Sequence, residues 1–441
     1  MISEEFLYFL WSNRLFNPSS LRLSSGEPID ILHPGFRNSG SGPDFIQSKI
    51  RIDGLIWAGS VEIHVLAGDW KKHGHHADPA YNPVILHAVH ELDTEVKTQL
   101  GSSLPTLVLK GAYDPALLER FQRLTQRLDR IPCASQLKTV SSLVKADVMA
   151  KMLVERLQDK ISRMKPMADQ HEEEWPELLY RLLGRAMGFR TNAEGFDWLC
   201  KQLPYSIIKR NLGDPETVEA LLFGTSGLLQ IAPAEPYANR LMKAWQRMQR
   251  HYRIEPIPAH AWTFGSARPG NFPSLRIAQF ASLMSSGSDL FDSVREPIQL
   301  SDMINRLNTS PSDYWQIHFR FGHPSHTHSG RMGKDGLHAL VINAIAPFLF
   351  YYGKRRHSPL LCDKALHWLD SIPPESNRIT RMWSDLGWTA TSAAESQAQF
   401  RLKQSQCDYR LCVRCGIGQD LIRGDLPKSS FRREMISSQE A

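Results

Sequence analysis

The sequence has no long uninterrupted hydrophobic run. Its longest apolar stretch, Leu340–Tyr352, is interrupted by Asn343 and Pro347 and falls short of the ~20 residues that cross a bilayer. The first residues, MISEEFLYFLW, carry two acidic side chains where a secretory signal peptide would carry positive charge. We therefore expect no membrane association and a cytoplasmic location.

Neither positive nor negative side chains are in large excess: the sequence has 52 Lys and Arg and 46 Asp and Glu, which gives a net charge of +6. This balance allows a nucleic acid as partner without requiring one. Cysteine is scarce, with 6 in 441 residues, and in a reducing compartment we expect thiols rather than disulfides. Hydrophobic residues make up 42% and charged residues 22%, as in globular proteins, and the length predicts two or three domains.

The fold class predicted is α+β, with a small α/β domain at residues 1–130 whose mixed sheet contains a hairpin. Asp53-Gly54 separates two alternating apolar runs, which is a strong signal for a two-residue hairpin turn. Apolar spacing and turn residues predict a helix, strands and a single helical turn in the following places: helix Glu4–Arg14, strands Phe45–Ile52, Leu55–Leu66, Val84–Val89 and Thr106–Leu109, and the turn Asp78–Asn82.

The remaining chain is predicted to be mainly helical over residues 131–385. A helix plus a cysteine-rich segment follows at 386–428, and a disordered tail at 429–441. The predicted helices lie at Val144–Met164, Glu177–Met187, Glu216–Phe223, Tyr237–Tyr252, Leu275–Met284 and Leu337–Phe350. Their apolar residues recur at the period of an amphipathic helix. The oligomeric state does not follow from these patterns.

A cluster of acidic and histidine side chains is predicted on the hairpin. Glu62 and His64 are two residues apart on one strand, so they point to the same face. Asp44 stands at the entry to the preceding strand, and the hairpin brings it towards Glu62. Two neighbouring carboxylates repel each other unless a cation lies between them. The pattern therefore indicates a metal site, and a bound divalent ion could polarise a phosphoryl oxygen and activate water.

The pairing of Pro43-Asp44 with Glu62-Ile63-His64, 18 residues apart from acid to acid, resembles the PD-(D/E)XK nuclease superfamily. The resemblance implies a restriction-endonuclease-like domain, Mg²⁺ or Mn²⁺ held by Asp44 and Glu62, His64 beside the attacking water, and a helical acid, here Glu5. The chain departs from the superfamily at His64, where a lysine is usual. A neutral imidazole does not replace a fixed ammonium charge.

Histidines are concentrated after the hairpin, since six of the chain's seventeen lie between positions 64 and 90. The loop residues are of ligand type but lack the fixed spacing of a zinc motif; they are Asp69, His73, His75, His76 and Asp78. His87 is predicted to point from its strand into the core. Tyr81, Asn82 and His73 are candidate substrate contacts. A polar loop beside a half-buried sheet would explain the same residues.

Three cysteines, Cys407, Cys412 and Cys415, fall within nine residues. This spacing suits Zn²⁺ or an iron–sulfur cluster, as in those PD-(D/E)XK nucleases that join a C-terminal cysteine triplet to a distant fourth cysteine. The candidates for a fourth ligand are Cys133, Cys200, Cys362 and His357. Buried cysteine is also ordinary core material, so a structural role without metal is the alternative.

Arg268, Asn271 and Arg276 lie at a loop-to-helix junction and could bind phosphate. The alternative is a loop held in place by hydrogen bonds within the fold.

Motifs along nearly the whole chain resemble the uncharacterised bacterial domain-of-unknown-function family 2851. They are GPDF at 42–45, VEIH at 61–64, DWxxHGH at 69–75, YNxVILH at 81–87, ARPGNFPxxRIAQ at 267–279 and CVRCGIG at 412–418. That family implies no activity. Three hypotheses follow: a divalent-metal-dependent nuclease-like hydrolase on DNA or RNA, a non-catalytic nucleic-acid-binding or scaffold protein of nuclease-like fold, and a zinc-dependent hydrolase that uses the histidine-rich loop.

Overall fold

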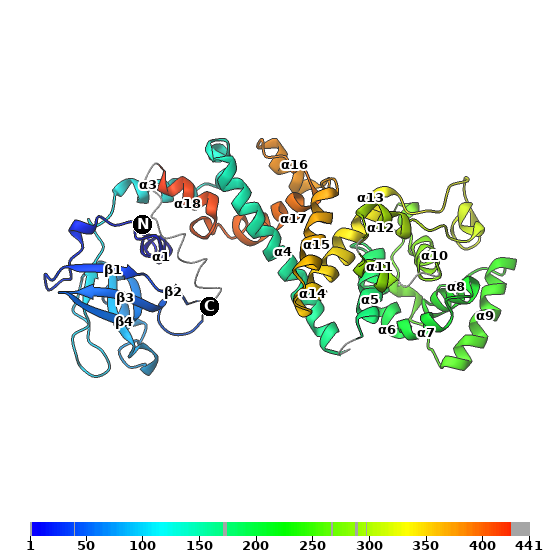
Figure 1. Cartoon of the computed structure of the whole chain (residues 1–441), viewed down its shortest axis with the longest axis horizontal. Helices are drawn as coiled ribbons and strands as arrows, with labels where there is room; N and C mark the ends of the chain where they lie inside the picture. The colour runs from blue at the N-terminus through cyan, green and yellow to red at the C-terminus, as the bar shows by residue number, and fades with distance from the viewer. Residues whose placement is uncertain are drawn as a thin grey trace. The chain divides into compact units, whose positions relative to one another are not determined.

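The computed structural model describes residues 2–38, 40–170, 174–265, 268–286, 290–296 and 298–424. The chain forms two compact units, Met1–Ala150 together with Arg401–Ala441, and Lys151–Phe400. We call them the sheet unit and the helical unit (Figure 1). The sequence placed domain boundaries near 130 and 386, whereas the sheet unit takes in the chain up to 150 and again from 401. The predicted tail at 429–441 lies outside the described residues.

A six-stranded mixed sheet forms the centre of the sheet unit, in the order β1-β3-β4-β5-β6 with β2 paired to β3. The strands are β1 (Ile29–His33), β2 (Phe36–Arg37), β3 (Phe45–Ile52), β4 (Leu55–Leu66), β5 (Val84–Glu91) and β6 (Thr106–Val108). The β3–β4 pair is antiparallel, and β5 is parallel to both of its neighbours. The predicted α+β class, with a mixed sheet first and mostly helices after it, is confirmed.

The predicted hairpin is present to the residue, with Ile52 paired to Leu55. Asp53 and Gly54 both have positive φ, 46° and 81°, as a two-residue turn that matches the twist of the strands requires. Strand β4 lies at the middle of the sheet, and its residues 60–64 are buried on both faces. This explains why a strand can hold Glu62 and His64 out of solvent.

Helix α1 (Glu4–Asn13) packs on the sheet unit through an almost unbroken apolar sequence. Its Trp11 is fully buried, lies against the Phe45 ring at 6.4 Å between centroids and donates from Nε1 to the Pro34 carbonyl at 2.8 Å. The packing of these rings fixes the rotation of α1 about its axis. It therefore decides which acid of the first turn faces the sheet.

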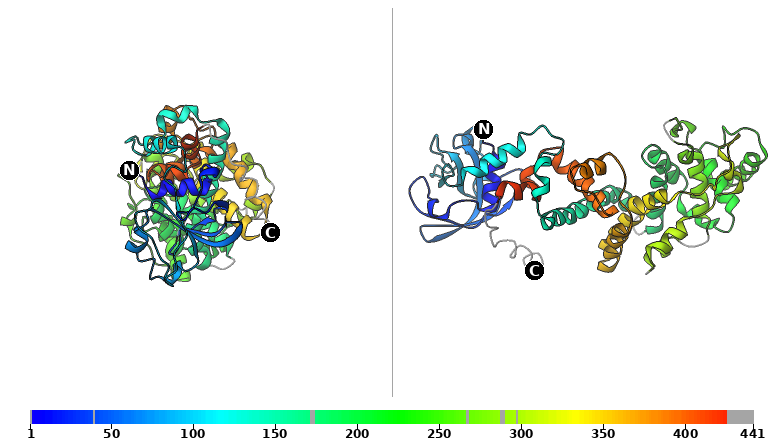
Figure 2. Two further views of the ribbon diagram at one scale, coloured as in Figure 1. Left: turned by 90° about the vertical axis from the view of Figure 1, so that its left-hand side faces the viewer. Right: turned by 90° about the horizontal axis from the view of Figure 1, so that it is seen from above.

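The cysteine-bearing segment folds onto the sheet unit rather than forming a domain of its own. It consists of a π turn (Lys403–Cys407), a 3₁₀ turn (Cys412–Arg414) and α18 (Gly416–Arg423). Helix α18 lies beside α3 (Pro115–Thr125), as Figures 1 and 2 show. This contact explains why the chain from 401 onward belongs to the first unit.

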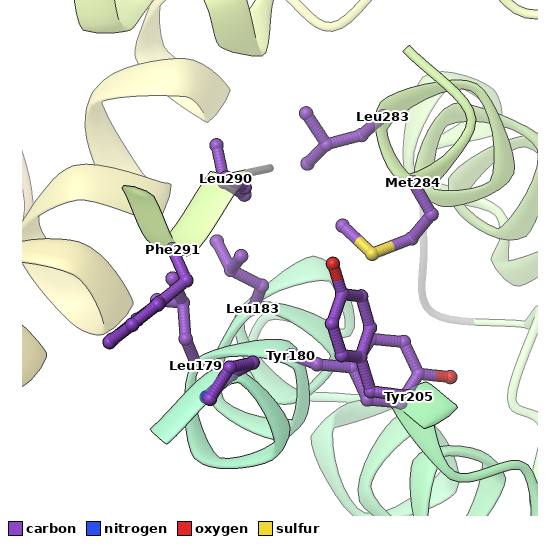
Figure 3. Close-up of a pocket in the computed structure, with 9 residues that line it drawn as sticks. Leu179, Tyr180, Leu183, Tyr205, Leu283, Met284, Leu290 and Phe291 are labelled. Carbon is purple, nitrogen blue, oxygen red and sulfur yellow. The ribbon is translucent and has the colours of Figure 1, made fainter. Parts of the chain in front are cut away.

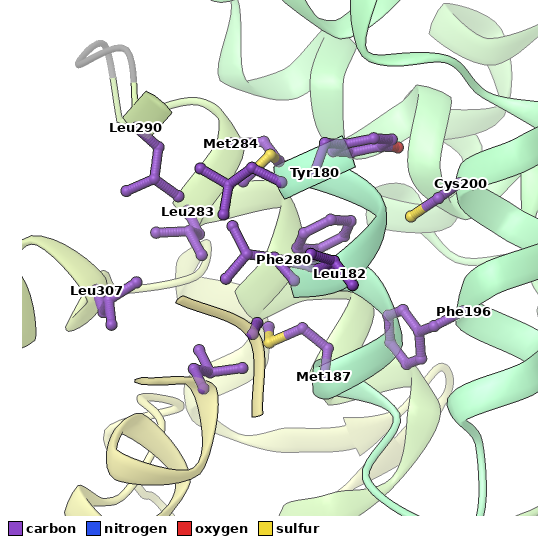
Figure 4. Close-up of a cluster of buried hydrophobic side chains, with 14 of the residues drawn as sticks. Tyr180, Leu182, Met187, Phe196, Cys200, Phe280, Leu283, Met284, Leu290 and Leu307 are labelled. Atoms are coloured by element: carbon purple, nitrogen blue, oxygen red, sulfur yellow. The ribbon is translucent and has the colours of Figure 1, made fainter. Parts of the chain in front are cut away.

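The helical unit is built around one large apolar core. Its helices are the C-terminal part of α4 (Ser142–Gln170), α5 (Trp175–Met187), α6 (Ala193–Gln202), α7 (Tyr205–Arg210), α8 (Pro215–Thr225), α9 (Pro236–Tyr252), α10 (Pro273–Met284), α11 (Leu290–Arg295), α12 (Leu300–Leu307), α13 (Lys334–Leu340), α14 (Ala346–Arg355), α15 (Pro359–Ser371), α16 (Arg378–Asp385) and most of α17 (Ala393–Leu402). Tyr180 stacks on Phe280 at 5.4 Å between centroids, and Phe196 meets Phe280 edge-on. Figure 4 shows how these rings interlock with aliphatic side chains.

The stretch Lys334–Arg355 is long and apolar enough to cross a membrane by composition, yet 78% of its most apolar window is buried inside the protein. It runs through α13, a π turn at Val341–Ile345 and α14. Pro347 lacks the N–H that a regular helix would use, and such a defect accompanies the wider π turn. In this structure the stretch is a core helix of the helical unit.

Candidate metal centre

Strand β4 carries Glu62 and His64 on one face at the centre of the sheet. In its parallel pairing with β5, Glu62 stands opposite His87 and His64 opposite Val89, so these four side chains share a face. The exposed fractions of Glu62 and His64 are only 4% and 2%. A carboxylate and an imidazole are therefore buried next to each other.

Asp44 and Glu62 are held side by side by two reciprocal hydrogen bonds. The Asp44 backbone N–H donates to Glu62 Oε2 at 2.9 Å, and the Ile63 N–H donates to Asp44 Oδ2 at 3.0 Å. Burial, and after it the charge of Asp44, raises the pKa of Glu62 to about 8. Burial also raises the pKa of Asp44. Negative charge is thus disfavoured here, and a bound cation would reverse that preference.

The loop after β4 brings two more imidazoles to Glu62 and His64. His73 Nδ1 lies 3.2 Å from His64 Nε2, and His75 Nε2 lies 3.2 Å from Glu62 Oε1, which is itself 3.6 Å from His64 Nε2. One ring nitrogen from each of the three histidines lies within 4.8 Å of the other two. We call Glu62, His64, His73 and His75 the histidine–glutamate cluster.

This loop is positioned by a buried tryptophan on the short helix α2 (Asp69–Lys72). Trp70 is 1% exposed and donates from Nε1 to the Lys97 carbonyl at 3.1 Å. The His75 N–H bonds back to the Trp70 carbonyl at 3.1 Å, and Gly74 takes a φ of 79° between them, a conformation that suits glycine. The His75 ring then stacks on Tyr81 at 3.8 Å between centroids.

His87 supports the cluster from behind, through a contact of 2.8 Å between its Nε2 and His64 Nδ1. It is fully buried, as predicted for a core residue. Burial first, then the neighbouring histidines, lowers the pKa of His64 to about 3, so this ring is neutral. A metal on His64 Nε2 requires the proton on Nδ1, where it would donate to His87. Such an outer hydrogen bond is the usual support of a metal-bound histidine.

The first turn of α1 contributes two acids to this neighbourhood, Glu4 and Glu5. Glu5 forms ion pairs with Arg37 at 2.9 Å and Arg414 at 2.7 Å. Glu4 accepts a hydrogen bond of 3.4 Å from the Tyr8 hydroxyl, and its pKa is raised by burial and by the charge of Asp44. Glu4 and the predicted Glu5 are therefore both near Asp44, because the charge of Glu5, after burial, also contributes to the raised pKa of Asp44.

The structure gives the other predicted residues the following surroundings. Tyr81 stacks on His75, as described, and Asn82 donates to Gln99 Oε1 at 3.0 Å. Their predicted contact with substrate stays a prediction. His75 was not singled out from the sequence, and its signal was the DWxxHGH spacing, which places it two residues beyond His73.

Arg276 is buried in the helical unit, and burial lowers its pKa to about 10. It donates to Gln279 Oε1 at 2.9 Å and to Asn271 Oδ1, while its guanidinium lies over the Phe189 ring at 4.6 Å. Arg268 is exposed at the start of a 3₁₀ turn. The Arg276–Asn271 bond holds the loop to its helix, and the predicted phosphate binding stays a prediction.

A small cavity of about 20 Å³ lies within the core of the helical unit, which is room for about one water molecule. Figure 3 shows its lining of Leu, Met, Phe and Tyr side chains from α5, α7, α10 and α11. Its size fits a packing void rather than a substrate.

A larger cavity of about 910 Å³ in the helical unit is lined by four basic side chains, Arg156, Lys160, Arg185 and Arg190, and by the acids Glu194 and Asp197. Arg185 pairs with Glu194 at 2.6 Å, and Asp197 pairs with Arg181 and Lys201. The lining therefore has a surplus of positive charge, which favours an anionic occupant.

Residues 4–378 match the family model described as "Protein of unknown function (DUF2851)". No curated protein and no solved structure matches the chain.

Proposed function

The chain belongs to the DUF2851 family, whose description names no activity, and we therefore propose a function from the site. The proposed function is a divalent-metal-dependent hydrolase of nucleic-acid phosphodiesters, centred on the histidine–glutamate cluster. The observation that carries the proposal is the approach of one ring nitrogen each from His64, His73 and His75 within 4.8 Å of one another. Beside them, Glu62 Oε1 lies 3.6 Å from His64 Nε2 and 3.2 Å from His75 Nε2. Neutral ring nitrogens and a carboxylate are the donors that a divalent transition ion prefers.

This ligand set combines two of the hypotheses from the sequence, the divalent-metal-dependent nuclease and the zinc-dependent hydrolase that uses the histidine-rich loop. Imidazole favours Zn²⁺ or Mn²⁺ over Mg²⁺, since Mg²⁺ takes oxygen ligands. An ion held by His64, His73, His75 and Glu62 would supply an activated water and would polarise a phosphoryl oxygen. Asp44 and Glu4 would stand beside it as further acids, each with a raised pKa.

The phosphodiester substrate rests on the resemblance to PD-(D/E)XK nucleases and on charge. Asp44 and Glu62 stand on the two strands of the hairpin, and α1 brings the acid Glu4 to them, as in that superfamily. His64 replaces the usual lysine and is neutral. In our proposal it therefore binds the ion instead of supplying a fixed charge. The basic cavity of the helical unit would suit the phosphate backbone of a nucleic acid.

The first test measures metal binding by the full chain after treatment with a chelator. With Mn²⁺, which cysteine thiolates do not select, we expect one ion per chain by calorimetry and loss of that binding in the double variant His73→Ala/His75→Ala. With Zn²⁺, which the cysteines can also hold, we expect the same double variant to bind one ion fewer than the wild type. His76→Ala is the matched control, because His76 lies in the same exposed loop but is not one of the three clustered histidines. A wild-type protein that binds neither ion would end the proposal.

The second test measures cleavage of end-labelled single- and double-stranded DNA and RNA with Mn²⁺ or Zn²⁺ added. Asp44→Asn and Glu62→Gln should lower the rate by roughly 100-fold or more, the loss expected when transition-state charge is no longer stabilised. His76→Ala should retain the wild-type rate. Metal binding without cleavage of any of the four substrates would keep the metal centre and contradict the hydrolase.

A further inference from the structure

Four of the six cysteines lie in the sheet unit although they come from distant parts of the sequence. Cys133 precedes a 3₁₀ turn at Ala134–Thr139, and the other three belong to the segment after Arg401. Of the sequence candidates for a fourth ligand, Cys200, Cys362 and His357 lie in the helical unit. Cys133 alone among them shares a unit with the triplet.

Hydrogen bonds tie the Cys133 segment to the triplet. Arg410, between Cys407 and Cys412, donates to the carbonyls of Thr125 and Arg127, and Arg127 donates to the Ser135 hydroxyl. The backbone at Arg410 takes a φ of 55°, an uncommon conformation for a residue other than glycine. The chain is therefore bent at this point to bring Cys407 and Cys412 towards the loop that carries Cys133.

The four cysteine side chains are close enough to affect one another's ionisation, and they are not surrounded by apolar groups alone. The exposed fractions of Cys133, Cys412 and Cys415 are 8%, 8% and 9%. Burial, followed by the proximity of Cys415 and Cys412, raises the pKa of Cys133 to about 12. The pKa of Cys407 is likewise raised by burial and then by Cys415, Cys133 and Cys412. Each thiol is therefore within electrostatic range of others in the group, and none of them forms a disulfide.

The backbone around Cys412 leaves no room for a side chain on Gly418. A Cβ there would stand 2.1 Å from the Cys412 carbonyl oxygen. The Cys415 N–H bonds back to that same oxygen at 3.2 Å. The turn that presents Cys412 and Cys415 is thus tightly closed, and α18 starts directly from it.

From this convergence we infer that Cys133, Cys407, Cys412 and Cys415 ligate an iron–sulfur cluster, a second metal centre separate from the histidine–glutamate cluster. Four thiolates are the usual ligand set of such a cluster. Burial disfavours the ionised form of these cysteines. A bound metal reverses that preference, because it takes its cysteine ligands as thiolates.

The spacing of the sulfur atoms favours a cluster over a single zinc ion. Zinc–sulfur bonds of about 2.3 Å put four tetrahedral thiolates about 3.8 Å apart. Within the described part of the chain, however, the group of three ligand atoms mutually within 4.8 Å is that of His64, His73 and His75, so no three of the four sulfurs are that close. An iron–sulfur cluster separates its thiolates more widely, because different iron atoms bind them.

The cluster would fasten the C-terminal segment to the sheet unit. Arg414, between two of the ligands, pairs with Glu5 on α1 at 2.7 Å, and Arg423 on α18 donates to Asn13 at the end of α1. Helix α1 also carries Glu4. The cluster therefore has a structural role, holding in place a segment that braces the helix beside Asp44.

The test begins with the wild-type full chain, expressed with added iron and purified without oxygen. We expect iron and acid-labile sulfide in equal amounts and the broad visible absorption of an iron–sulfur cluster. Cys407→Ser, Cys412→Ser and Cys133→Ser should each lose sulfide and absorption. Cys362→Ser, a half-buried cysteine of the helical unit, should keep both, as should His73→Ala/His75→Ala, which separates this centre from the first.

A second measurement avoids dependence on variants that fail to fold. In the native wild-type chain, the four named thiols should resist alkylation and become labelled once iron is removed, as mass spectrometry would show. Cys200, which is fully buried in the helical unit, should stay unlabelled in both states. Zinc in place of iron, an absence of sulfide in the anaerobic protein, or a triplet variant that keeps its absorption would overturn the inference.

Discussion

Each unit of this protein buries a glutamate, and the two glutamates have very different neighbours. In the helical unit, Glu219 on α8 is 7% exposed. Its Oε1 accepts hydrogen bonds from the Tyr237 hydroxyl at 2.6 Å, Trp315 Nε1 at 3.0 Å and the Ser312 hydroxyl at 3.2 Å. Neutral donors fixed by the fold satisfy this carboxyl group, so it needs no ligand.

Glu62 in the sheet unit is as deeply buried but lies among a second carboxylate and imidazoles. One backbone N–H reaches its Oε2, while Asp44 raises its pKa and two histidine nitrogens face its Oε1. Burial alone therefore does not mark a functional site. The distinguishing feature of Glu62 is that a second carboxylate and imidazole nitrogens surround it. A bound cation or a proton can interact favourably with all of these acceptor groups at once.

The largest effect we predict comes from Glu219→Ala. Removal of this carboxyl group takes their shared acceptor from Trp315, Tyr237 and Ser312, which among the described residues keep only one another as partners. This should lower the free energy of unfolding by about 3 kcal/mol. The loss should be the same with and without added metal. Denaturant unfolding monitored by circular dichroism measures it.

Glu62→Ala supplies the contrasting result. In the metal-free protein the lost hydrogen bond from Asp44 is offset by removal of a buried carboxyl group whose ionisation burial and Asp44 disfavour, so stability should change by less than about 1 kcal/mol. The stabilisation that Zn²⁺ or Mn²⁺ gives the wild type should disappear. Equal responses to metal in the two variants would remove the distinction between the two glutamates.

A smaller effect is expected from pH in the metal-free protein. Burial lowers the pKa of His64 and of His87 from 6.5 to about 3, so their contribution to stability is present above pH 6.5 and is lost as the pH falls towards 3. Glu62 behaves in the opposite way. Its pKa rises from 4.5 to about 8, so its contribution is present below pH 4.5 and is lost as the pH rises through 8.

Among His64, His87 and Glu62, the two histidines outweigh the one glutamate up to pH 6.5, and above that pH only Glu62 of these three still titrates. The stability of the chelator-treated sheet unit should therefore pass through a maximum at about pH 6.5. Saturating metal should remove the decline above it, because the ion holds Glu62 ionised. Thermal unfolding at about pH 5, 6.5 and 8.5 tests this, and a steady rise of stability to pH 8.5 without metal would contradict it.

The local part of the candidate site was predictable from the sequence. Alternating apolar residues on either side of Asp53-Gly54 predict the hairpin. The final pairing also needs a β-bulge between Phe45 and Ser48, which shifts the register by one residue and brings Asp44 beside Glu62. Six helical stretches, from α4 to α14, were predicted from their apolar period in the same way, whereas α6, α7, α11, α12, α15 and α16 were not. These features depend on neighbours in sequence, which is the information that a pattern contains.

The remaining parts of the sites depend on contacts between distant residues. His73 reaches His64 and His75 reaches Glu62 because Trp70 is buried and bonds to Lys97, and no pattern in the loop encodes that bond. Apolar residues occupy Phe6–Trp11 without a break, so they do not indicate which side of α1 meets the sheet, and Glu4 could not be told from Glu5. Cys133 lies 274 positions before Cys407, and the fold alone relates them.

The smallest effect that we predict concerns aromatic stacking, which also allows the two units to be compared. In each unit a tyrosine ring stacks on a histidine ring. Tyr81 lies on His75 at 3.8 Å between centroids in the sheet unit, and Tyr314 lies on His318 at 3.9 Å in the helical unit. Aromatic stacking of this kind contributes about 0.5–1.5 kcal/mol. If the stack positions His75 as a metal ligand, Tyr81→Leu should weaken metal binding by roughly threefold to tenfold.

Tyr81→Phe keeps the ring and should bind metal as the wild type does, which would assign the effect to stacking rather than to the hydroxyl group. Tyr314→Leu is the matched control: it removes the same kind of stack from a histidine outside the clustered three, so it should alter stability and leave the metal affinity unchanged. Calorimetric titration of the three variants measures all of these outcomes. If Tyr81→Leu binds metal as tightly as Tyr81→Phe, then His75 is held by Trp70 and Gly74 alone, and the stack in the sheet unit has the same purely structural role as its counterpart on Tyr314.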